Sequence, residues 1–132
     1  PGRMLSGEEM SRREALSVAF SGIEEYEREL CWKMIEGLQT IDGLKIWGIP
    51  DPSMKQHRAP TVSFTHPSMT AEKIGEALAE KGIFAWAGNF YALELSEALG
   101  LEPEGALRVG ILHYNTTEEI DRFVDELSGI LG

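Results

Sequence analysis

Hydrophobic side chains recur at helical spacing near the beginning of the chain and again at its end. From roughly residue 12 to residue 39 they step by three or four positions, which predicts one long helix with a single apolar stripe. A similar stripe runs from Ile120 to Leu131. Each helix is preceded by a capping box, in which a hydroxyl and a carboxylate satisfy free backbone amides of the first turn. These capping boxes are Ser11 with Glu14 and Thr116 with Glu119, and the first apolar stripe consists of Leu16, Ala19, Phe20, Ile23, Tyr26, Leu30, Met34, Ile35 and Leu38.

Short segments between these two helices alternate between apolar and polar residues, which is typical of strands with one buried face. The last of them is the clearest, because Leu107, Val109 and Ile111 alternate with Arg108 and its neighbours. Two shorter helices are also expected, one from a Thr70 cap to a stop at Gly82 and one over residues 93–100. The predicted strands are residues 44–48, 61–65, 83–87 and 107–112, with a polar, proline-broken connector over residues 51–60.

The order of these elements is helix, strand, strand, helix, strand, short helix, strand and helix. Such a mixture has too few strands for a doubly wound parallel sheet, so it predicts an α+β fold. We expect a small, mainly antiparallel sheet of about four strands with helices packed on one face. Residues 1–11 are interpreted as a flexible lead-in and residues 12–132 as one domain. The uncovered face of the sheet is expected to need a partner.

Composition narrows the possible functions. The chain has 132 residues and a formal net charge of −10, which disfavours a nucleic-acid surface, since such surfaces need clustered lysine and arginine. Its apolar runs are too short to cross a bilayer, so we expect no membrane partner. A single cysteine, Cys31, excludes an internal disulfide and is compatible with a reducing cytoplasm. We expect Cys31 to be a packed thiol rather than a nucleophile.

Several kinds of catalytic site are not supported by the residue pattern. The three histidines, His57, His66 and His113, are far apart and show no metal-ligand spacing. The glycines are isolated turn markers that form no phosphate-binding loop, and no nucleophile elbow is present. The residues alone therefore indicate no complete catalytic set and no metal.

Arg108 is the most informative single residue. It is an isolated cation on a predicted strand, on the face opposite the aliphatic residues and just before a tight turn. A fold can present a guanidinium there to a carboxylate ligand. The pattern leaves open whether Arg108 binds a ligand or is an ordinary surface arginine.

An ordered set of short motifs resembles a known family. The set comprises Thr61-Val62-Ser63-Phe64, then Gly82-Ile83-Phe84-Ala85-Trp86-Ala87-Gly88, then Arg108-Val109-Gly110, and finally Tyr114-Asn115-Thr116 followed by Glu118-Glu119. Together they resemble the C-terminal small domain of the class V aminotransferase and cysteine desulfurase family, whose members are fold-type I pyridoxal-phosphate enzymes. The resemblance runs from about residue 12 to the last residue.

The resemblance implies a role for particular residues. Arg108 falls where the family keeps the arginine that binds the substrate's α-carboxylate, and Asn89 and Tyr91 become candidates for substrate binding. Tyr91 stands where cysteine desulfurases carry the cysteine that takes up sulfur, and Trp86 stands where they often have another basic residue. Both departures weigh against sulfur transfer. The segment Gly88-Asn89-Phe90-Tyr91-Ala92-Leu93 resembles the desulfurase-like subgroup of the family.

The resemblance also implies the partners of the chain. The pyridoxal phosphate would be held by a large domain whose lysine is not in this chain, so the chain alone is expected to be inactive and to contain no cofactor-binding or catalytic residue. A homodimer is expected for the full-length enzyme, with a small amino acid as substrate. The alternative is an autonomous α+β module that binds a ligand or a protein.

Overall fold

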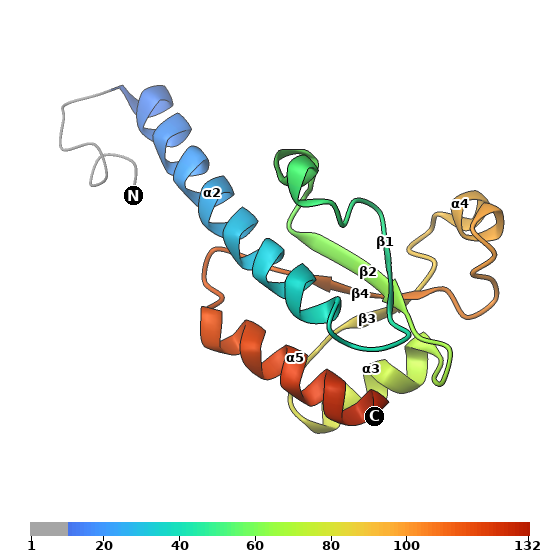
Figure 1. Ribbon diagram of the computed structural model, residues 1–132. Coiled ribbons are helices and arrows are strands. Elements are labelled where there is room, and N and C mark those ends of the chain that lie inside the picture. Colours follow the sequence, from blue (N-terminus) through green and yellow to red (C-terminus); the bar gives the residue numbers. More distant parts are fainter. Residues whose placement is uncertain (1–10) are drawn as a thin grey trace.

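The computed structural model describes residues 11–132, and the predicted lead-in up to residue 10 lies outside the described residues. Helices and strands alternate along the chain much as the hydrophobic pattern predicts (Figure 1). The helices are α2 (Arg12–Leu38), α3 (Ala71–Glu80), α4 (Leu93–Ala98) and α5 (Thr117–Leu131), with a 3₁₀ helix η1 (Pro52–His57), and the strands are β1 (Lys45–Trp47), β2 (Thr61–Thr65), β3 (Trp86–Gly88) and β4 (Ala106–Gly110).

The four strands form one sheet in the order β1-β2-β4-β3, and every neighbouring pair is antiparallel. The three longer helices, α2, α3 and α5, lie together on one side of this sheet (Figure 1). The predicted α+β class, with a small antiparallel sheet covered by helices on one face, is therefore confirmed. The short helix α4 is the exception, because it borders a cavity on the other side of the sheet.

The core lies between the sheet and the three longer helices. Phe64 and Leu107 point into it from the two central strands and are fully buried. The Phe64 ring packs against Phe123 of α5, with 6.5 Å between the ring centroids. Burying such large apolar side chains contributes about 1.5–3 kcal/mol each. The remaining large, fully buried side chains are Met34, Ile35, Leu38, Val62, Ile74, Leu78 and Leu127.

The apolar stripe predicted for the first helix is buried over only part of its length. From Leu30 onward the stripe packs against the core, but the first half of α2 projects beyond the sheet and α5 (Figure 1). There Phe20 is 65% exposed and Leu16 and Tyr26 are also exposed. Helical periodicity predicts which residues share a face, but what covers that face depends on the length of the neighbouring elements.

Two predicted segments differ in the structure by more than one or two residues at their ends. The third strand was expected at residues 83–87, but β3 begins only at Trp86. Residues before Trp86 belong instead to the turn that ends α3, since the Ile83 amide donates to the Leu78 carbonyl at 3.0 Å. The connector at residues 51–60 contains η1, which begins where the Asp51 carboxylate accepts from the Ser53 amide at 2.8 Å. Asp51 and the following proline together favour this turn.

Candidate functional site

One row of four side chains crosses the sheet on the side away from the three longer helices. Trp47 is paired with Ser63, Ser63 with Arg108, and Arg108 with Trp86. Directly paired residues in an antiparallel sheet point to the same face. We call the face that carries this row the open face.

Arg108 lies at the centre of the open face. Its neighbours Leu107 and Val109 are buried on the helix side, whereas Arg108 is exposed. The guanidinium carbon lies 3.9 Å from the centre of the Phe90 ring. Among residues 11–132 the Arg108 side chain makes no hydrogen bond or ion pair. Its donors are therefore available to a ligand as far as the described residues are concerned.

The loop between β3 and α4 carries the other predicted site residues. Phe90 and Tyr91 both have left-handed backbones, with φ of 57° and 62°, and they are the only described non-glycine residues with positive φ. A bulky residue in this region is strained, and such strain is often kept at functional sites. Tyr91 is fully exposed at the tip of this loop. Its position fits a residue that meets a ligand or another part of a protein.

Asn89 holds the loop in this shape. Its side-chain oxygen accepts from the Tyr91 amide at 3.2 Å, and its side-chain nitrogen donates to Glu102 at 3.2 Å. The Ala92 amide also donates to the Asn89 carbonyl, at 2.9 Å. The structure therefore brings Arg108 and Phe90 together and exposes Tyr91. The polar side-chain atoms of Asn89 bond instead to Tyr91 in the loop and to Glu102 beyond α4.

An apolar cavity of about 350 Å³ lies between the open face and α4. Phe90 forms part of its wall, and Ser63 and Ala106 form its floor. On its other side, Arg108 itself lines a groove of about 580 Å³ together with Trp86 and Phe84. Arg108 thus stands between an apolar cavity and an exposed aromatic groove. Further large apolar residues of the cavity wall are Trp47, Leu95, Leu99 and Leu101.

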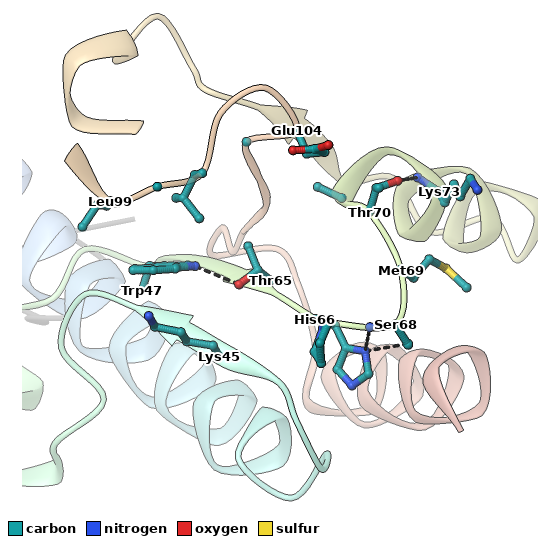
Figure 2. Close-up of a pocket in the computed structure, with 15 residues that line it drawn as sticks. Lys45, Trp47, Thr65, His66, Ser68, Met69, Thr70, Lys73, Leu99 and Glu104 are labelled. Carbon is teal, nitrogen blue, oxygen red and sulfur yellow. Dashed lines mark hydrogen bonds between the residues drawn. The ribbon is translucent and has the colours of Figure 1, made fainter. Parts of the chain in front are cut away.

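A more polar pocket of about 550 Å³ lies at the other end of the same face (Figure 2). Figure 2 shows the indole of Trp47 donating to the Thr65 hydroxyl, a bond of 3.1 Å. The Lys45 ammonium lies 3.6 Å from the centre of the same indole. His66 is held in place by Ser68 and by the Asp42 carbonyl, at 2.8 and 2.9 Å. The Trp47 indole, the Lys45 ammonium and the His66 ring of this pocket are thus engaged in contacts within the chain.

The remaining lysines lie away from the open face or are paired. Lys33, Lys55 and Lys81 form ion pairs with carboxylates at 2.5, 2.7 and 3.4 Å. Lys73 is exposed on α3 and lines the polar pocket. In the described part of the chain, no lysine lines the groove or the cavity that flank Arg108.

Cys31 is 3% exposed in the middle of α2, as predicted for a packed thiol. Burial raises the pKa of this thiol, which makes the nucleophilic thiolate scarcer. Its sulfur faces the Ala59 carbonyl at 3.8 Å. The described residues contain no cluster of three or more potential metal ligands, and His57 is exposed.

Phe90 is the site residue that sequence reasoning missed. A phenylalanine in a loop carries no local signal, and its contact is with a residue 18 positions further along the chain. The useful signal would have been two glycines, Gly88 just before the loop and Gly105 just before β4, because their backbones lie in contact. This contact brings the loop back to the start of β4.

Comparison with known proteins places the chain in a family. Residues 14–123 match the family model described as aminotransferase class-V. The chain is 34% identical over 116 residues to the aminotransferase-like protein FGM3 of Gibberella zeae, which covers 85% of the chain and 28% of that protein. It is 33% identical over 108 residues to a probable cysteine desulfurase 2 of Mycobacterium leprae, covering 82% of the chain and 25% of the relative.

A solved structure supports the same fold. The apo cysteine desulfurase from Thermococcus onnurineus NA1 superposes with a TM-score of 0.79 at 24% identity, over 90% of this chain and 28% of that one. The chain thus spans roughly a quarter of the length of the proteins it resembles. No helix among residues 11–132 has the length and hydrophobicity needed to cross a membrane. From the extent of the family match, the chain belongs to the class V aminotransferase family, which includes the cysteine desulfurases.

Proposed function

We propose that this chain is the C-terminal substrate-binding domain of a pyridoxal-phosphate-dependent enzyme, in which Arg108 binds the α-carboxylate of an amino acid. The observation that carries the proposal is the state of Arg108: an exposed guanidinium at the centre of the open face, resting on Phe90 and unpaired among the described residues. A planar guanidinium can donate two parallel hydrogen bonds to a carboxylate. No other described arginine combines these features.

The neighbours of Arg108 fit the same role. Tyr91 is exposed at the tip of the loop and is proposed to meet the substrate there, and Asn89 contributes by fixing that loop. The small amino-acid substrate would lie between them and Arg108. The family's cofactor-bearing large domain is the natural partner of the open face, and a cytoplasmic homodimer is the expected state of the complete enzyme.

The described residues do not form a pyridoxal-phosphate site by themselves. Schiff-base chemistry needs a lysine beside the substrate, and none lines the cavity or groove next to Arg108. Lys45, which lines the polar pocket, contacts the Trp47 indole. The cofactor, which supplies the electron sink of the family's chemistry, therefore belongs to the rest of the enzyme, and the isolated chain should not turn over amino acids.

The position of the single cysteine bears on the type of reaction. A desulfurase that stores sulfur on this domain needs an accessible thiolate, but Cys31 is buried in α2 and its pKa is raised by burial. Tyr91 at the loop tip cannot form a persulfide. We therefore favour amino-acid chemistry of the aminotransferase kind over sulfur transfer onto this domain.

The test is to replace Arg108 in the complete protein. Arg108→Lys keeps the charge but loses the planar fork, so kcat/KM for the amino-acid substrate should fall by about tenfold or more. Arg108→Ala should lower it further, while the Tm of both variants stays near that of the parent. Unchanged catalysis with a lowered Tm would mean that Arg108 only braces the sheet.

A further inference from the structure

Phe90 lies directly against the guanidinium of Arg108, at 3.9 Å from the ring centre to the guanidinium carbon. This is well inside the range of about 6 Å in which a cation is attracted to an aromatic face. The two residues come from different elements, since Phe90 belongs to the loop after β3 and Arg108 to β4. The loop must therefore fold back over the sheet to make this contact.

The loop keeps this contact despite a backbone cost. Phe90 has φ of 57°, a conformation that glycine or asparagine adopts with much less strain. The Asn89 side chain and the close approach of Gly105 to Gly88 hold the loop in place. An aromatic residue in a position suited to glycine indicates that the ring itself is needed there.

The contact decides which part of Arg108 stays free. The Phe90 ring covers the side of the guanidinium that it contacts. A carboxylate binds in the guanidinium plane, along its edge. An arginine whose plane is already fixed loses less side-chain entropy when it binds. Phe90 also lines the apolar cavity, so the ring separates that cavity from the guanidinium.

We infer that Phe90 is a positioning residue, whose ring holds the guanidinium of Arg108 in the orientation that receives the carboxylate. The inference rests on the proposed role of Arg108 in carboxylate binding. Phe90 contacts the Arg108 guanidinium and affects substrate binding only by orienting that guanidinium.

The first experiment measures binding of the common L-amino acids to the complete protein loaded with pyridoxal phosphate, by titration calorimetry. With the tightest binder, Phe90→Leu should raise Kd by about three- to tenfold, the scale of a cation–π contact. Phe90→Tyr keeps the aromatic face and should restore binding. Phe20→Leu, an exposed phenylalanine on α2, is the matched control and should leave Kd unchanged.

A double-mutant cycle separates this inference from the proposed function. In an Arg108→Ala background, Phe90→Leu should have no further effect on Kd, because its action passes through Arg108. If Phe90→Leu weakens binding equally in both backgrounds, or has no effect in the parent, the positioning role is wrong while the role of Arg108 stands. If Arg108→Ala binds like the parent, or no amino acid binds, the proposed function fails first.

A spectroscopic readout remains if Phe90→Leu does not fold. The Nε proton of Arg108, assigned with Arg108→Lys, should show the upfield NMR shift of a group stacked on an aromatic ring. In Phe90→Tyr the shift should persist. An Arg108 signal at the position of a freely exposed arginine in the parent protein would overturn the inference.

Discussion

Gly105 determines whether the loop that carries Phe90 can sit against the sheet. A Cβ at this position would lie 2.2 Å from the carbonyl carbon of Gly88 and 2.3 Å from its oxygen. Both neighbouring atoms are backbone, so they cannot move aside as a side chain could. Gly105 also has φ of +68°, which disfavours any residue with a Cβ.

We therefore expect Gly105→Ala to lower the free energy of unfolding by about 2 to 3 kcal/mol. Gly100→Ala is the matched control, because Gly100 has nearly the same φ of +69° but nothing within 4 Å of an added Cβ. Gly100→Ala should lower the free energy of unfolding by only about 1 kcal/mol, the cost of placing a residue with a Cβ at positive φ. Denaturant unfolding of both variants checks this, and equal losses would show that the contact with Gly88 is unimportant.

Among single residues, Arg108 could be identified as a candidate site residue from the sequence, whereas Phe90 could not. The alternation of Leu107 and Val109 with Arg108 fixes which side of the sheet the arginine faces, since strand residues alternate strictly. The partner of Arg108 depends on how the loop after β3 folds back, and that depends on tertiary contacts. Asn89 and Tyr91 were named from the family resemblance, and their roles in substrate binding remain predictions.

The N-terminus of α5 is held by a capping box. The Thr116 hydroxyl accepts from the Glu119 amide at 3.3 Å, and the Glu119 carboxylate accepts from the Thr116 amide at 2.9 Å. The Asn115 side chain donates to the same carboxylate at 3.1 Å. The bond from Asn115, and then that from Thr116, lowers the pKa of Glu119 below its ordinary value of 4.5. The charged form therefore stabilises the start of this helix.

The sign of the pH dependence follows from this shift. A carboxyl group with a lowered folded-state pKa contributes stability above its unfolded pKa, and that contribution is lost as the pH falls through the folded pKa. Glu119→Gln should therefore lower Tm near neutral pH, and the difference from the parent should shrink below about pH 4.5. Glu80→Gln, an exposed glutamate with no hydrogen bond among the described residues, should show no such trend. A Tm difference that stays constant with pH would rule out this role of the Glu119 charge.

Elements whose ends are set by local residues were predicted well. Both capping boxes are present as predicted, because each needs only residues three positions apart. The third strand was misplaced, since its first residue is decided by where Arg108 of β4 lies opposite it. The 3₁₀ turn at η1 was missed although Asp51 and Pro52 carry its local signal.

At the scale of the whole molecule, the open face combines exposed aromatic and aliphatic side chains with few covering elements. Trp86 is 70% exposed there, and Leu112 just beyond β4 is also exposed. Patches of exposed apolar side chains usually mark interaction sites. The first half of α2 is a second exposed apolar surface, at Leu16 and Phe20.

We expect the isolated chain to self-associate through the open face. Sedimentation equilibrium at increasing concentration should show a rising average mass, and Trp86→Glu should shift it toward the monomer. Phe20→Glu is the control for the exposed half of α2. A clean monomer at high concentration would contradict the expectation, and a loss of association in Phe20→Glu alone would assign the contact to α2.

The most direct test of the central claim compares an amino acid with its amide, which differ only in the carboxylate. The complete protein should bind the acid at least about tenfold more tightly than the amide, the worth of roughly one charge-assisted hydrogen bond. Arg108→Ala should bind the two with nearly equal Kd, because the discriminating guanidinium is gone. A preference for the acid that survives unchanged in Arg108→Ala would contradict the assignment of Arg108 as the carboxylate-binding residue.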